Sequence, residues 1–223
     1  MQSVSVRQSS HVAAELSRYR AAEHKPVAAH HSWPWRACAL GPAMLLCAGI
    51  AYGADQVSVD AVRQGSAVAV RARATLRAPL DVIWQTLTDY DHLAEFIPGI
   101  RKSQVIDRHG NAAIVEQAGR AAFLFFTYPI QVVVRSEEYH PWVIRVRVLT
   151  GNLKQLDGGY RIERIEGTDD RFVLRWSGII EPDTPLPLFI TVPLVRANLQ
   201  DQFLAMIVEI ERREALRAKT QGG

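Results

Sequence analysis

The sequence predicts an α+β domain in which a curved antiparallel sheet of about six to seven strands surrounds a long C-terminal helix. Three observations lead to this fold class. Between residues 66 and 180, segments with strand character follow one another across short turns, which leaves no chain for the crossovers that parallel strands require. Two short helical segments interrupt this series after its first strong strand. The final segment has one apolar face at helical spacing.

The strand predicted at residues 66–76 shows the underlying pattern best. Residues 66–76 (SAVAVRARATL) alternate apolar side chains with Arg71 and Arg73, which is typical of a half-buried strand. These arginines mark a charged convex face, or one of them reaches a cavity and anchors a ligand carboxylate.

In chain order the expected elements are a weak strand or lead-in (57–63), a strand (66–76), two short helices (81–87 and 92–96), six strands (100–107, 112–118, 121–137, 142–149, 159–165 and 172–180), a Pro-rich apolar loop (182–193) and a helix (194–219).

The C-terminal helix has a specific place in this fold. A curved sheet with one apolar face has to cover that face. Of the predicted helices, only the one at residues 194–219 is long enough to do so, and Leu199, Phe203 and Ile207 lie on its apolar side. We therefore expect it to lie in the concavity of the sheet.

The chain begins with a segment that we expect to contain a targeting signal and not to be part of the folded domain. Residues 36–54 have one positive charge, a short apolar stretch and then small residues, which is the layout of a secretory signal peptide. We predict cleavage after Gly53 or Ala54 and a periplasmic or secreted protein; an uncleaved inner-membrane anchor is the alternative. Residues 1–35 are interpreted as a disordered extension or a start codon assigned too far upstream, and the folded domain as residues 57–219.

Charge and cysteine content exclude several classes of function. The formal net charge of +3 comes from the first 54 residues, where five basic residues face two acidic ones, so the domain itself is balanced. A neutral domain has no electrostatic reason to bind nucleic acid. Cys38 and Cys47 both lie in the N-terminal segment, which excludes a disulfide, a thiol nucleophile or a cysteine metal site in the domain.

Two apolar segments are candidates for binding. Residues 121–134 (AAFLFFTYPIQVVV) are apolar on both faces of a predicted strand. Such a strand is buried at the centre of the fold, or one face lines a ligand cavity while the other meets a partner, a membrane or the Pro-rich loop. Phe189, in that loop, packs against the helix start, or residues 186–193 make a lid or a peripheral membrane contact.

Three motifs resemble the START-like (SRPBCC) superfamily, in particular its polyketide cyclase/dehydrase and coenzyme Q-binding branches. The first is LTDYDHL followed by EFIPGI, within residues 87–100. The second is GNLKQLDGGY at residues 151–160, with Tyr160 where the family commonly has Trp. The third comprises Leu-Pro at residues 186–187 and Pro-Leu at 193–194. The resemblance covers roughly residues 66–217.

The resemblance implies a helix-grip fold with a cavity between the sheet and the long helix. It implies lipids, quinones, polyketides or similar apolar molecules as ligands. With the apolar side chains of the predicted strands, loop and helix, this leads us to expect a ligand-binding pocket formed by Phe96, Phe123, Phe125, Tyr128, Trp142, Trp176, Phe189, Leu199, Phe203 and Ile207.

Three functions remain open at this point. The leading hypothesis is noncatalytic binding or transport of a hydrophobic small molecule in the bacterial cell envelope. The alternatives are a polyketide cyclase or hydratase and a ligand-free interaction module. No nucleophile elbow, phosphate loop or paired-carboxylate motif is present, and Asp91 and His92 are adjacent without a third ligand at metal spacing. We therefore expect neither a cofactor nor a metal.

Overall fold

The computed structural model describes residues 57–183 and 186–221. The signal peptide predicted at residues 36–54 and the extension predicted at residues 1–35 lie outside this part of the chain. The described part holds eight strands and four helical segments: β1 (Ser58–Gln64), β2 (Ala67–Arg77), α2 (Leu80–Leu87), the 3₁₀ helix η1 (Tyr90–His92), α3 (Leu93–Phe96), β3 (Ile100–His109), β4 (Ala112–Phe123), β5 (Phe126–Tyr139), β6 (Val143–Gly151), β7 (Leu153–Arg164), β8 (Arg171–Pro182) and α4 (Leu188–Gln221).

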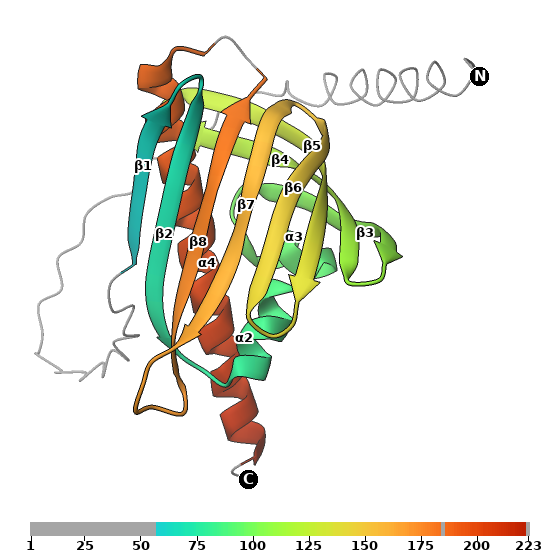
Figure 1. Cartoon of the computed structure of the whole chain (residues 1–223), viewed down its shortest axis with the longest axis vertical. Coiled ribbons are helices and arrows are strands. Elements are labelled where there is room, and N and C mark those ends of the chain that lie inside the picture. The colour runs from blue at the N-terminus through green and yellow to red at the C-terminus, as the bar shows by residue number, and fades with distance from the viewer. Residues whose placement is uncertain (1–56, 184–185, 222–223) are drawn as a thin grey trace, which may run out of the picture. The chain divides into compact units, whose positions relative to one another are not determined.

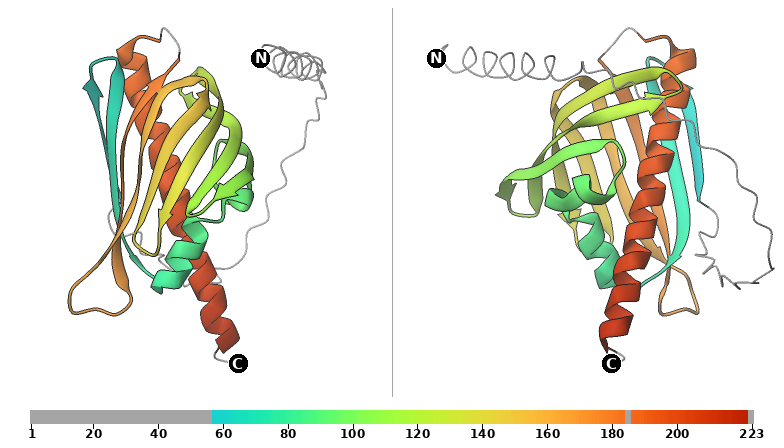
Figure 2. Two further views of the ribbon diagram at one scale, coloured as in Figure 1. Left: turned by 45° about the vertical axis from the view of Figure 1, so that its right-hand side comes forward. Right: turned by 180° about the vertical axis from the view of Figure 1, so that it is seen from behind.

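The strands form one antiparallel sheet, and the α+β helix-grip prediction is confirmed. The strand order is β1-β2-β8-β7-β6-β5-β4-β3. The sheet curves around α4, while α2, η1 and α3 lie beside the lower half of that helix (Figures 1 and 2). The sheet has eight strands rather than six to seven, because the weak segment at residues 57–63 pairs fully with β2, from Ser58 opposite Arg73 to Gln64 opposite Ala67.

The turn between β4 and β5 lies at Leu124 and Phe125, not at residues 119–120 as the sequence suggested. Leu124 has a φ of 54°, a turn conformation, and the chain reverses there. Gly119 instead lies within β4. The position requires glycine, because a Cβ there would lie 2.1 Å from the Gly99 carbonyl oxygen. The glycine thus permits close backbone approach and does not mark a turn.

The glycine pair at residues 158–159 lies inside β7, which begins at Leu153 rather than at residue 159 as predicted. Gly158 is opposite Gly178 of β8. A Cβ at Gly178 would lie 2.8 Å from the Trp176 ring, and one at Gly158 would lie 3.2 Å from it. The two glycines therefore make room on the concave face for the indole of Trp176.

The long helix starts at Leu188 rather than at residue 194, so the predicted Pro-rich loop is shorter than expected. Pro193 lies inside the helix, where its ring removes one backbone hydrogen bond. The buried Thr191 stabilises the first turn, because its hydroxyl donates to the carbonyls of Leu186 (3.2 Å) and Pro187 (3.1 Å). Phe189 therefore belongs to the helix.

Ion pairs connect the segment of short helices to α4. Arg213 donates to Asp89 (2.8 Å) and to the buried Glu209 (2.7 Å), and Arg217 donates to Asp81 (2.7 Å). Burial would raise the pKa of the Asp89 carboxyl, but hydrogen bonds from His92 and Arg213 outweigh it and hold that pKa below its ordinary value. These contacts hold α2, η1 and α3 against the lower half of α4.

We predict that Phe203→Ala lowers the free energy of unfolding by about 3–5 kcal/mol, since Phe203 is fully buried between α4 and the sheet. Leu204→Ala, at the next position but 40% exposed, is the control and is expected to cost less than about 1 kcal/mol. Urea denaturation of both variants measures the difference. Equal losses would mean that α4 does not present the Phe203 face to the core.

Candidate functional site

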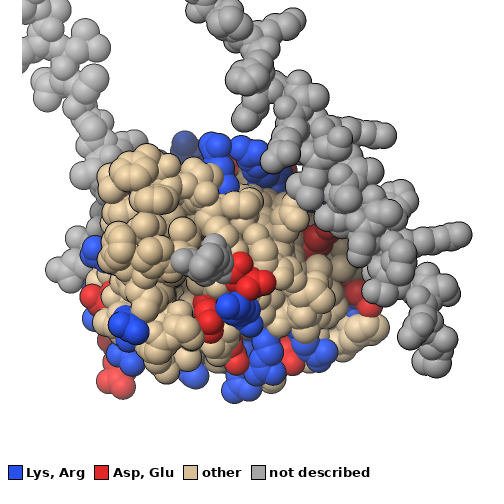
Figure 3. Space-filling model, turned by 90° about the horizontal axis from the view of Figure 1, so that it is seen from above, with Lys and Arg blue, Asp and Glu red and all other residues tan. Residues whose placement is uncertain are grey.

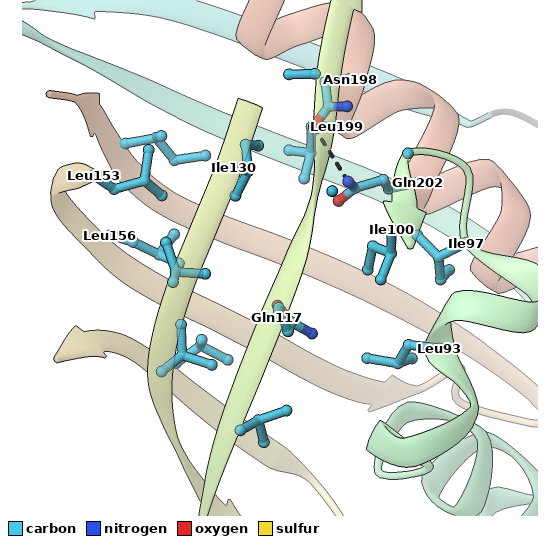
Figure 4. A pocket seen from close by; sticks show the side chains of 18 of the residues that line it. Leu93, Ile97, Ile100, Gln117, Ile130, Leu153, Leu156, Asn198, Leu199 and Gln202 are labelled. Atoms are coloured by element: carbon cyan, nitrogen blue, oxygen red, sulfur yellow. Dashed lines mark hydrogen bonds between the residues drawn. The ribbon is translucent and has the colours of Figure 1, made fainter. Parts of the chain in front are cut away.

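A cavity of about 210 Å³ lies between the concave face of the sheet and α4. Figure 4 shows its interior, with aliphatic side chains from β5, β7, α3 and α4 around the space. Its walls are mostly aliphatic, with a few uncharged polar groups. The principal lining residues are Tyr90, Leu93, Ile97, Ile100, Gln117, Tyr128, Ile130, Val132, Val134, Ser136, Val146, Leu153, Leu156, Tyr160, Trp176, Ile180, Val195, Asn198, Leu199, Gln202 and Met206.

Strand alternation explains which side chains of the sheet reach the cavity. Successive side chains of a strand point to opposite faces, so every second residue of β5 from Tyr128 to Ser136 lines the space. Pro129, Gln131 and Arg135, between them, are exposed on the convex face. The apolar run at residues 121–134 is therefore a hairpin, and one face of its β5 arm forms a cavity wall.

Helix periodicity places the opposite wall. Val195, Asn198, Leu199, Gln202 and Met206 recur every three or four positions along α4 and all line the cavity. The residues that follow two of them, Phe203 and Ile207, lie a little further round the helix. They are packed into the core.

The polar side chains of the wall are neutral tyrosines and amides. Burial raises the pKa of the Tyr160 hydroxyl to about 12. Burial, together with the charge of Glu138, also raises the pKa of the Tyr90 hydroxyl. Both tyrosines therefore remain protonated at neutral pH. The Tyr128 hydroxyl donates to the Asn152 carbonyl (2.6 Å), which connects β5 to the turn between β6 and β7.

Charged groups are nearly absent from the cavity wall. Arg120 is the one charged residue among the described lining residues, and its side chain is exposed. Across residues 57–183 and 186–221, no group of three metal-ligating side chains is found. No helix in the same ranges is long and apolar enough to cross a membrane.

The structure brings three of the predicted pocket residues together on the cavity wall: Tyr128, Trp176 and Leu199. Phe203 and Ile207 instead fill the core, because they lie on the part of α4 that meets the sheet directly. The prediction that either residue lines the pocket is not supported by this placement.

The remaining predicted pocket residues lie away from the cavity. Phe96 packs under the guanidinium of Arg213, 5.4 Å from its ring centre, and Phe123 is half-buried at the end of β4. Trp142 is 38% exposed in the turn before β6, while Phe125 and Phe189 are 84% and 79% exposed. The turn at residues 124–125 and the early start of α4 direct Phe125 and Phe189 into solvent.

Most residues of the aliphatic wall and all of its amides were not predicted from the sequence. Ile130, Val132 and Val134 could have been found by period-two alternation once the turn at residues 124–125 was known. Asn198 and Gln202 had a direct signal, because they interrupt the apolar side of a helix at positions one turn apart.

Three large apolar side chains are exposed at one end of the domain. Leu124 and Phe125 form the tip of the β4–β5 hairpin, which lies beside the start of α4, where Phe189 is found (Figures 1 and 2). Figure 3 views this end, and a broad part of it carries neither acidic nor basic side chains. We call Leu124, Phe125 and Phe189 the apolar tip.

Comparisons with solved structures show the fold that the sequence suggested. Zhui aromatase/cyclase from Streptomyces sp. R1128 is 17% identical, with a TM-score of 0.58 over 70% of this chain and 99% of its own. A STAR-related lipid transfer protein from Xanthomonas axonopodis is 11% identical, with a TM-score of 0.59 over 71% and 95%. A START superfamily protein from Mycobacterium smegmatis is 15% identical, with a TM-score of 0.53 over 65% and 97%.

Sequence comparison identifies the family. No curated protein matches the chain. The model of the family described as polyketide cyclase / dehydrase and lipid transport matches residues 76–206, which span the short helices, the six strands from β3 to β8 and the part of α4 that lines the cavity. This match covers more than half of the chain, and the structural neighbours have the same START-like fold. The chain therefore belongs to the polyketide cyclase / dehydrase and lipid transport family of the START-like (SRPBCC) superfamily.

Proposed function

We propose that this protein binds and carries a hydrophobic small molecule, such as a lipid, a quinone or a polyketide-like compound, without transforming it. The observation that carries the proposal is the cavity of about 210 Å³, which the side chains of the domain leave open. A single water needs only about 10–15 Å³ of such space, so the cavity has room for several waters. Mostly aliphatic walls give such waters few hydrogen-bond partners, and an apolar ligand would release them and gain about 25 cal/mol per Å² of apolar surface buried.

The same lining supports binding over catalysis. Cyclisation and dehydration need positioned groups that give and take protons, and these are most often His, Asp, Glu or Lys. The described lining residues provide only tyrosine hydroxyls, one serine and amides besides the exposed Arg120. The family includes polyketide cyclases, and a cyclase or hydratase is therefore the alternative that a reaction assay would have to exclude.

The bacterial cell envelope is the location we propose, on the basis of the signal-peptide pattern at residues 36–54. The apolar tip supports a peripheral membrane contact there. Burying a large apolar side chain contributes about 2 kcal/mol, so Leu124, Phe125 and Phe189 together would contribute about 6 kcal/mol before ordering costs. That magnitude suits weak and reversible association, as a carrier that loads and unloads at a membrane requires.

We predict that the purified full-length chain binds naphthalene, an apolar probe, and that Leu156→Trp weakens this binding at least about tenfold because the indole fills the cavity. Leu149→Trp, on the neighbouring strand but 49% exposed, is the matched control and should bind as the unmodified protein does. Calorimetric titration measures the dissociation constants, and thermal unfolding checks that the variants fold. Absence of naphthalene binding to the unmodified protein would refute the carrier proposal.

For the membrane contact, replacing Leu124, Phe125 and Phe189 together with Ser should reduce binding to vesicles of phosphatidylethanolamine and phosphatidylglycerol by at least about tenfold. The physical reason is the loss of the apolar surface that enters the bilayer interface. Leu216→Ser, at the other end of α4 and 50% exposed, is the control. Co-sedimentation with vesicles measures the bound fraction, and equal binding by both variants would contradict a contact through the tip.

Protein recovered from the periplasm of its host is expected to start at Ala54 or Asp55 and to contain an extractable apolar molecule. Intact-mass spectrometry under denaturing conditions reports the cleavage site, and native mass spectrometry reports the added mass of the ligand. A full-length mass found only in the cytoplasmic fraction would contradict the proposed location.

A further inference from the structure

Three amide side chains are among the polar groups that line the cavity. Asn198 and Gln202 lie one turn apart on α4, and Gln117 lines the same cavity from β4 (Figure 4). Gln202 Nε2 donates to Asn198 Oδ1 (3.2 Å), and Gln117 Nε2 donates to Ser103 Oγ (3.3 Å). In these two hydrogen bonds Asn198 uses its oxygen, while Gln117 and Gln202 each use an N–H group. Because each amide has two N–H donors and an oxygen with two lone pairs, each of the three keeps hydrogen-bonding capacity beyond these bonds, beside an apolar chamber.

The kind of ligand follows from what this wall lacks. A carboxylate or an ammonium group drawn into the cavity would lose its hydration, and no described carboxylate, lysine or histidine lines the space to compensate for that loss. Arg120 is the one charged group, but it is exposed, and a solvated guanidinium attracts an anion only weakly. A hydroxyl or a carbonyl, in contrast, can accept from an amide nitrogen, and a hydroxyl can also donate to an amide oxygen.

We infer that the cavity selects an uncharged ligand, an apolar body that carries a hydroxyl or carbonyl group, and that Gln117, Asn198 and Gln202 recognise this group. The inference rests on the proposed function, since it names the ligand class of the same cavity. It separates neutral alcohols, ketones, esters and quinone-like carbonyl compounds from free fatty acids and amines.

Three probes with the same eight-carbon chain test it: octan-1-ol, octanoate and octylamine, titrated into the purified full-length chain at pH 7.4 by calorimetry. Octan-1-ol is expected to bind at least about tenfold more tightly than either ion, because only the ions lose their hydration without a compensating charge. Octanoate binding as tight as that of octan-1-ol would overturn the inference, and loss of that binding in Arg120→Gln would show that the cavity selects anions.

Variants of the amides give an independent test. Asn198→Leu and Gln202→Leu should each weaken octan-1-ol binding about three- to tenfold and leave naphthalene binding within about twofold. Gln200→Leu makes the same change at an exposed position of α4 and should alter neither. Unchanged octan-1-ol binding in the two variants would overturn the inference. The carrier proposal would still stand in that case, provided that the unmodified protein binds naphthalene. No naphthalene binding to the unmodified protein would remove both.

Discussion

One long helix, α4, has to cover most of the concave face of an eight-stranded sheet. The helix is much narrower than the sheet, and the cavity results from this difference in width. Adjacent strands lie about 4.8 Å apart, so eight strands extend over roughly 34 Å, whereas a helix with its side chains is about 10 Å wide. Curvature of the sheet reduces the difference without removing it. Phe203 and Ile207 fill the space where α4 meets the sheet directly, and the rest stays open between α4 and β5 to β7. The hydrophobic core and the binding site are thus neighbouring parts of one interface.

Polar contacts determine how that open space is bounded. The short helices contribute Tyr90, Leu93 and Ile97 to the wall, and the ion pairs of Asp89 and Asp81 with arginines of α4 hold these helices in place. On the sheet, Gly158 and Gly178 give up their side chains so that the Trp176 ring can lie against the backbone. Residues outside the cavity wall therefore shape the cavity, because they position the helices and strands that form the wall.

The uneven distribution of polar groups connects the cavity to the surface of the domain. Aliphatic side chains form most of the chamber, the amides of Gln117, Asn198 and Gln202 also line it, and the apolar tip lies at the end where α4 begins. The proposed carrier would use both features: the cavity would hold its ligand away from water, and the tip would bring the domain to the membrane, where such ligands dissolve. The start of α4 is common to both, since Phe189 is exposed at its first turn while Val195 and Asn198 line the cavity further along.

The sequence by itself determined the fold class and the order of the elements. Alternation at residues 66–76 and the apolar face of the C-terminal helix depend on local periodicity, which the chain carries without reference to its neighbours. Glycine and proline were ambiguous, because Gly119, Gly158 and Pro193 resemble turn or boundary signals, while their effect depends on what lies against them in space. Only the tertiary structure decided which apolar residues line the cavity. Phe203 and Leu199 share one helix face, and the difference between a filled core and an open wall comes from strands that lie far away in the sequence.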